Sequence, residues 1–176
     1  EEAEKPVRPY TYPTLDLLDP PTPPSEQDTD TEFKKKAIVD KFKEFNIESE
    51  IYEVIQGPTF TLYKAYAYVP RGKQINYCLT LESDMAMAMR VQNVRMTLLP
   101  AEGAVGIEAP NKNRRVVNFI ELVKSEQFVK AKSTAVMALG QDIYGTNRVM
   151  EFDKLPHALV AGATGMGKSC CLNTLI

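Results

Sequence analysis

Residues Ala158 to Ile176, "ALVAGATGMGKSCCLNTLI", decide the fold expected for the C-terminal part of this chain. A short apolar run, His157 to Ala161, precedes a glycine-rich stretch, and the residues from Lys168 onward suit a helix. A central parallel strand is covered on both faces and therefore need not alternate apolar and polar side chains. The order of strand, glycine-rich turn and helix is typical of the first unit of a nucleotide-binding domain.

The glycine-rich stretch satisfies the pattern G-x-x-x-x-G-K-[ST]. Its glycines permit backbone conformations that other residues avoid, so successive N–H groups can point at phosphate oxygens, and the helix that follows adds the positive end of its dipole. We expect Lys168 to reach the β- and γ-phosphates of ATP and the Ser169 hydroxyl to bind Mg²⁺, which makes both candidate catalytic residues. The predicted ATP-binding residues are Gly162, Ala163, Thr164, Gly165, Met166, Gly167, Lys168, Ser169 and Cys170. The alternative is a glycine-rich turn that binds no ligand.

The composition is that of an ordinary soluble globular protein, with 44% hydrophobic and 25% charged residues in a chain of 176. We find no apolar window of membrane-spanning length and no signal peptide, and we expect a cytoplasmic segment without membrane contact. Cys78, Cys170 and Cys171 show neither metal-ligand nor disulfide spacing, which fits a reducing compartment. Magnesium bound by Ser169 is therefore the one metal that the sequence predicts.

Charge and proline separate the N-terminus from the remainder. Eight acidic and two basic residues give residues 1–30 a net charge of −6, which leaves +4 for the rest of a chain whose total is −2. Seven of the twelve prolines lie in residues 1–24. Because proline fixes φ and removes a hydrogen-bond donor, we predict an acidic linker over 1–30. The mildly basic body permits a nucleic-acid partner without requiring one.

The body begins with a predicted helix over 31–46, followed by strands over 47–55 and 59–69 that are joined by a Gly57-Pro58 turn. We expect the lysine run 34–36 on the solvated face of the helix. The second strand is expected to be half buried, with one apolar face. The aromatic stripe expected in the core of the helix comprises Phe33, Ala37, Phe42 and Phe45, and the apolar face of the strand comprises Phe60, Leu62, Tyr66 and Tyr68.

Further along, Ser83 is the predicted cap of a helix through 84–92, and Met85, Met87 and Met89 are expected in the core. A helix is predicted over 119–125, and the predicted strands cover 94–99, 105–107, 134–139 and 148–152. The fold class is therefore α/β: a compact α+β unit over 31–132, then the start of a nucleotide-binding domain over 133–176. A parallel partner for the strand at 157–161 needs a crossover connection, so we expect that domain to be incomplete within this chain.

Six blocks give the chain a resemblance to a known family. They are "YPTLDLL", "GPTFTLY", "SDMAMAMRVQNVRM", "GAVGIEAPNKNRR", "ALGQDIYG" and "LPHALVAGATGMGKS". In order and spacing they resemble the FtsK/SpoIIIE family of bacterial double-stranded DNA translocases, over nearly the whole chain from Tyr12 to Ile176. This resemblance is more specific than the phosphate loop by itself.

The resemblance implies a membrane-anchored parent protein with a cytoplasmic motor that forms hexameric rings and pumps duplex DNA in cell division or sporulation. Residues 31–132 correspond to its α domain, and 133–176 to the first part of its RecA-like ATPase (β) domain, truncated here. Pro110 and Asn111 match a block with an expected structural role, and Gly140 and Asp142 match the turn into the ATPase domain. Met166 and Cys170 depart from the usual residues of the family loop, where a small or polar residue and a valine are common.

The resemblance also places the acidic Mg²⁺-binding strand, an arginine finger and the DNA-contacting loops beyond Ile176. We therefore expect this chain alone not to hydrolyse ATP efficiently. Lys112, Arg114 and Arg115 form a basic patch that is a candidate for DNA or subunit contact, with a solvated loop as its alternative. Two other functions stay open: a related hexameric ATPase of a secretion or conjugation system, and a non-catalytic ring-forming module.

Overall fold

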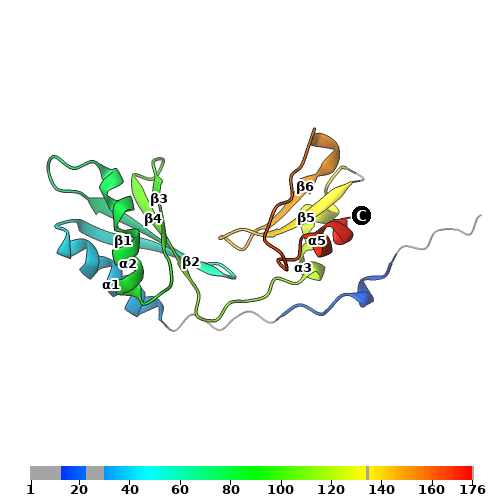
Figure 1. The fold of residues 1–176 in the computed structure, drawn as a ribbon, viewed down its shortest axis with the longest axis horizontal. Coiled ribbons are helices and arrows are strands. Elements are labelled where there is room, and N and C mark those ends of the chain that lie inside the picture. The colour runs from blue at the N-terminus through cyan, green and yellow to red at the C-terminus, as the bar shows by residue number, and fades with distance from the viewer. Residues whose placement is uncertain (1–12, 23–29, 134, 176) are drawn as a thin grey trace, which may run out of the picture.

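The computed structural model describes residues 13–22, 30–133 and 135–175. Its helices and strands form two bodies that are joined by an extended segment after β4 (Figure 1). The first body holds α1 (Thr31–Glu44), α2 (Glu82–Met89) and the strands β1 (Glu48–Gln56), β2 (Phe60–Tyr68), β3 (Arg95–Leu99) and β4 (Ala104–Pro110). The second holds α3 (Phe119–Val123), α4 (Glu126–Val129), β5 (Val136–Gln141), β6 (Asn147–Glu151) and α5 (Lys168–Leu175). None of the helices in the described ranges is long and apolar enough to cross a membrane.

The four strands of the first body form an antiparallel sheet with the order β1-β2-β4-β3. The predicted turn at Gly57-Pro58 is present, and the Gly57 N–H donates to the Phe60 carbonyl at 2.9 Å. A register shift between Ile51 and Glu53 makes Tyr52 the extra residue of a β-bulge. The strands predicted at 47–55, 59–69, 94–99 and 105–107 are therefore confirmed, with small differences at their ends.

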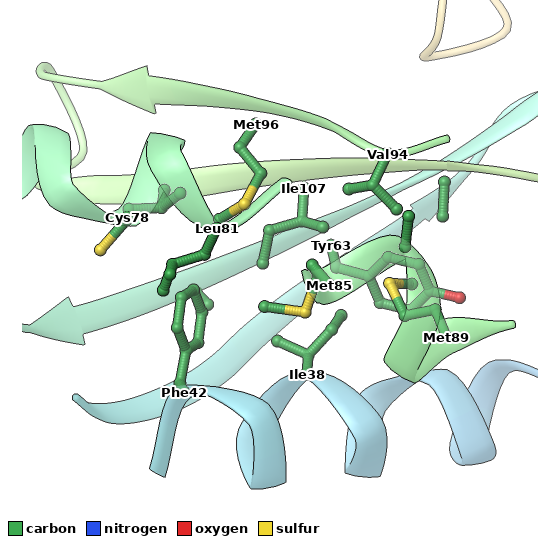
Figure 2. Packing of buried hydrophobic residues seen from close by; sticks show 14 of the residues in the cluster. Ile38, Phe42, Tyr63, Cys78, Leu81, Met85, Met89, Val94, Met96 and Ile107 are labelled. Carbon is green, nitrogen blue, oxygen red and sulfur yellow. The ribbon is translucent and has the colours of Figure 1, made fainter. Parts of the chain in front are cut away.

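One face of this sheet packs against α1 and α2, and the core lies between them (Figure 2). Ile38 and Phe42 are spaced four residues apart and therefore lie on the same face of α1. Both are fully buried, as is Tyr63 of β2, which lies among them. The fully buried or nearly buried side chains at the centre of the core are Ile38, Phe42, Tyr63, Met85, Met89 and Ile107.

Three predictions for the helices are wrong at single residues. Met85 and Met89 are buried, but Met87 is 75% exposed, because positions two apart in a helix point in nearly opposite directions. Phe33 is 46% exposed at the start of α1, so the predicted aromatic stripe reaches the core through Phe42 and not through Phe33. Ser83 is not a cap, since α2 begins at Glu82, directly after the 3-10 helix η2 (Ile75–Leu81).

Lys34 also differs from its prediction. The sequence placed it on a solvated face, yet only 3% of its surface is exposed. Its ammonium group donates a hydrogen bond to the carbonyl oxygen of Pro110 at 3.3 Å. The first turn of α1 therefore lies against the end of β4, and its lysine stem is covered by that contact.

The buried faces of β2 are a further correction. Tyr63 and Ala65 point to the helices, so the core face has the opposite parity to the one predicted. Leu62 and Lys64 are buried as well, on the other face of the sheet. There Lys64 pairs with Glu53 at 2.9 Å and with Glu102 at 3.0 Å. On this face Lys64 is buried by ion pairs with residues of other segments, whereas helices bury the opposite face. Alternation along a single strand does not reveal such partners.

The second body is built on the β5–β6 hairpin, against which α3 and α4 pack. Its turn is held by Asp142, which accepts backbone hydrogen bonds from Tyr144 and Thr146 at 2.9 Å each and pairs with Arg148 at 2.6 Å. Desolvation opposes ionisation of this carboxyl, but these donors outweigh it and hold its pKa below the usual value. The strands predicted at 134–139 and 148–152 and the helix predicted at 119–125 are confirmed as β5, β6 and α3, with differences at their ends, and residue 134 lies outside the described residues.

The N-terminal segment contacts the second body at the start of α3. The Thr22 hydroxyl donates to the Asn118 side chain at 2.6 Å, and the Asn118 amide donates to the Pro20 carbonyl at 3.0 Å. In Figure 1 this segment accordingly runs beneath α3. Asn118 therefore ties residues 20–22 to the point where the chain enters the second body.

Candidate nucleotide-binding site

The residues that lead into the phosphate loop are extended but form no strand. The predicted strand at His157–Ala161 is wrong, because the described chain contains no strand that pairs with this segment. Leu159 is 93% exposed and Val160 is 39% exposed. An isolated extended segment cannot satisfy its backbone donors and acceptors except through water, so it stays on the surface.

The loop itself has the backbone that its glycines predict. Gly165 and Gly167 have φ of +82° and +81°, in the region that residues with a Cβ rarely adopt. The helix α5 begins directly at Lys168, and the Cys171 N–H donates to the Gly167 carbonyl at 2.8 Å. The N–H groups of the first helical residues have no acceptor within the helix, so they are available to a ligand at this end.

Lys168 folds back over the loop. Its ammonium group donates to the carbonyl oxygen of Gly162 and, at 3.4 Å, to that of Ala163. A Cβ at Gly162 would lie 3.5 Å from the Lys168 side chain, which is ordinary van der Waals contact, so the lysine stem packs against this glycine. Both partners are neutral carbonyls, and the loop therefore keeps the full positive charge of Lys168.

A cavity of about 430 Å³ opens above the loop. Its lining residues are Ala163, Thr164, Gly165, Gly167, Lys168, Ser169 and Cys170. Seven of the nine predicted binding residues are thus brought together. Gly162 contributes its carbonyl to Lys168, and Met166 is 76% exposed and does not line the cavity.

The lining fits a phosphate chain by its chemistry. It offers a lysine, the hydroxyls of Thr164 and Ser169 and the free N–H groups of a helix start, and no described lining residue carries a carboxylate. In the described ranges no three His, Cys, Asp or Glu residues form a metal cluster. The Ser169 hydroxyl, which is exposed at the first turn of α5, is the group that would hold Mg²⁺.

The predicted basic patch is divided by the structure. Arg115 pairs with Glu121, and its backbone N–H donates to the Pro58 carbonyl at 2.8 Å. Lys112 and Arg114 lie elsewhere and line a second cavity together with Lys34 and Arg90. Sequence reasoning missed Lys34 and Arg90 because they come from α1 and from the end of α2, far from residues 112–115 in the sequence.

Asn111 has the structural role expected for the block "GAVGIEAPNKNRR". The Thr61 hydroxyl donates to its side-chain oxygen at 2.7 Å, and its amide donates to the Gly57 carbonyl at 2.8 Å. Its backbone N–H donates to the Thr59 carbonyl at 2.9 Å. With 4% of its surface exposed, Asn111 holds the β1–β2 turn to the end of β4.

The comparison with family models agrees with this arrangement. The FtsK alpha domain model matches residues 12–111, and the FtsK/SpoIIIE family model matches residues 118–176. The chain therefore belongs to the FtsK/SpoIIIE family, as its sequence blocks indicated. The two matches meet at the extended segment that joins the two bodies in Figure 1.

The curated relatives are similar over nearly the whole chain. DNA translocase SftA of Bacillus subtilis is 33% identical over 100% of this chain and 18% of its own length. DNA translocase FtsK of Corynebacterium glutamicum is 35% identical over 95% of this chain, again 18% of its own length. The chain thus spans about a fifth of these relatives. A solved structure of the pCW3 conjugation coupling protein TcpA, in its monomer form with ATPγS, shares 16% identity over 81% of this chain and 40% of its own, with a TM-score of 0.39.

Proposed function

We propose that the chain is part of an ATP-driven double-stranded DNA translocase that acts in chromosome segregation at cell division or sporulation. The observation that carries this proposal is the loop at 162–170, with its positive-φ glycines, its lysine over the cavity and its helix start. Family membership and the printed names of the relatives support DNA as the substrate.

In this proposal the loop binds ATP and Mg²⁺. Bound ATP supplies the phosphoryl group whose transfer drives movement. Lys168, now bonded to the Gly162 and Ala163 carbonyls, would bind the phosphates together with the N–H groups at the start of α5, and the Ser169 hydroxyl would hold Mg²⁺. Cys170 lines the cavity beside Ser169, whereas Met166 contributes only backbone.

The residues of this chain suffice for binding but not for efficient hydrolysis. The described lining of the cavity contains one lysine and neither a carboxylate nor an arginine. Phosphoryl transfer needs groups that position water and stabilise charge in the transition state. We infer that the missing groups come from the rest of the motor or from a neighbouring subunit, in a homo-oligomer that we propose to be a hexamer.

The organisation of the parent protein follows the same proposal. Residues 1–30 are the acidic linker, 31–132 the α domain and 133–176 the start of the RecA-like domain. This segment is cytoplasmic and the parent is membrane-anchored. A related ATPase of a secretion or conjugation system would share the loop and differ in its cargo, and a ring-forming module would assemble without chemistry.

The test is ATP turnover by the full-length protein that carries this chain, with and without linear duplex DNA. We expect strong stimulation by DNA that Lys168→Ala abolishes. The control is Lys124→Ala, which removes an exposed lysine outside the cavity and should leave turnover unchanged. If DNA does not change the rate of ATP turnover, the proposal of a DNA substrate is wrong and a protein cargo is favoured. If the Lys168→Ala variant still turns over ATP, the proposed ATP-binding site is wrong.

A further inference from the structure

We propose that a second cavity, in the first body, binds the phosphate backbone of duplex DNA. This basic cavity has a volume of about 800 Å³ and lies between the start of α1, the end of α2 and the loop after β4. The nature of the polyanion rests on the proposed function, whereas the anion-binding character of the cavity rests on its own residues. The cavity is separate from the phosphate loop, with which it shares no lining residue.

Charge is the first argument. Four cationic side chains line the cavity and come from three separate segments of the chain: Lys34, Arg90, Lys112 and Arg114. Among the described residues that line it, Asp30 is the single carboxylate, and its oxygen lies 3.8 Å from the Lys112 ammonium. The described lining thus carries a net charge of +3. A solvated loop would contribute cations from one segment only, whereas three segments contribute cations to this cavity.

The wall formed by α1 strengthens the positive field. Lys34 is buried, with 3% of its surface exposed, and its ammonium group is fixed by the Pro110 carbonyl at 3.3 Å. The positive charge on this side of the cavity therefore comes from the Lys34 ammonium group.

Arg90 lines the same cavity from the end of α2 and has an unusual backbone. It ends α2 in the left-handed region, with φ 56° and ψ 42°, which costs a residue with a Cβ more than it costs glycine. Its guanidinium carbon lies 5.2 Å from the centroid of the Phe33 ring. The Phe33 ring, which is 46% exposed and also lines the cavity, thus stabilises the position of the guanidinium.

Exposure of the remaining cations favours a long polyanion over a small enclosed ligand. Lys112 has 70% of its side chain exposed, and Arg114 is exposed on the segment that leaves β4 for the second body (Figure 1). Arg90 is exposed as well, so three exposed cations lie beside the buried Lys34, an arrangement that suits successive phosphates along a duplex. DNA bound there would touch the connection between the two bodies.

The test compares two double variants of the full-length protein in binding to a fluorescein-labelled duplex over a range of salt concentrations. Arg90→Asn with Arg114→Gln removes two charges of the basic cavity, and Asn tolerates the left-handed backbone. Lys36→Gln with Lys43→Gln removes two exposed charges of α1 outside that cavity and is the matched control. If each of the two cations neutralises one phosphate, the plot of log K for DNA binding against log salt concentration becomes less steep by about 1.8 in the cavity variant only. Its affinity for DNA at low salt also falls, by about tenfold or more.

A cavity variant with the slope of the wild type would overturn the proposal, and so would an equal fall in both variants, which would reflect net charge. In either case DNA-stimulated turnover would leave the proposed function standing. If turnover ignores DNA but inorganic polyphosphate binding falls in the cavity variant alone, the proposed function fails and the anion site stands. Arg90→Gly is a second variant that separates loss of the guanidinium from misfolding, because glycine adopts the left-handed backbone of Arg90 freely. Weaker DNA binding with an unchanged Tm would then be due to the missing guanidinium.

Discussion

A Cβ added at Gly57 would lie 2.6 Å from the carbonyl oxygen of Ile143, so the β1–β2 turn touches the β5–β6 turn backbone to backbone. The two residues are far apart in the sequence and belong to the two bodies of the structure. Nearby, the Lys64 ammonium lies 5.9 Å from the centroid of the Tyr144 ring. The tips of two hairpins thus form a contact between the bodies besides the covalent connection.

We predict that Gly57→Ala weakens this contact. Because a methyl group cannot occupy the space of the Ile143 carbonyl, one turn must move, at a cost of about 1–3 kcal/mol. Hydrogen exchange at Tyr144 and Thr146 should accelerate, together with a lower Tm. The control is Gly72→Ala, which strains a φ of +84° but meets no atom within 4 Å, and exchange at these sites should not change. Equal effects of both variants would contradict a specific contact.

Asn111→Ala should lower the free energy of unfolding by about 1–3 kcal/mol, because the buried Thr61 hydroxyl loses its acceptor and the Gly57 carbonyl loses a donor. Thr61→Val removes the hydroxyl that donates a hydrogen bond to the Asn111 side chain. The cost of the double variant should be smaller than the sum of the single costs, as measured by urea unfolding. Strict additivity would show that the two side chains do not act together.

The ion-pair cluster on the outer face of the sheet should make stability depend on pH. The Tyr52 hydroxyl donates to Glu102, and this bond and the Lys64 ammonium hold the pKa of Glu102 below its usual value. Hydrogen bonds to Glu53 and Glu102 raise the pKa of Lys64, and the bond to Glu102 raises the pKa of Tyr52 to about 12.

The lowered pKa of Glu102 and the raised pKa of Lys64 decide how stability changes with pH. A carboxyl with a lowered pKa stabilises the fold above its unfolded pKa of 4.5, and this contribution is lost as the pH falls through the folded value. Lys64 contributes below its unfolded pKa of 10.5, and its contribution is lost only at a more alkaline pH. Glu102→Gln should therefore lose less stability than the wild type between neutral and acid pH, as measured by Tm. Parallel pH profiles would contradict the role of Glu102.

Two methionines of one helix provide a matched pair. Met85→Ala should cost about 2–5 kcal/mol, because Met85 is fully buried in the core shown in Figure 2. Met87→Ala should stay within about 0.5 kcal/mol, since Met87 is 75% exposed. Urea unfolding of both variants checks this, and a large cost at Met87 would mean that its face is covered in the protein as it exists in solution.

Local sequence patterns determined much of this protein. Periodicity, residue composition and turn signals located α1, α3 and the strands β1 to β6, because each of these patterns reports on neighbours a few residues away. The spacing of the glycines, Lys168 and Ser169 predicted the phosphate loop, because a positive φ and a helix start are properties of the local backbone.

Only the tertiary structure decided which faces are buried and which charges meet. The apolar run at 157–161 forms no strand, because a strand depends on a hydrogen-bonded neighbour that local composition does not provide. Lys34 is buried by the end of β4, and Lys64 by acids from β1 and from the turn after β3. The basic cavity likewise joins residues from distant segments. Burial and charge are set by contacts through space, and those contacts exist only once the chain has folded.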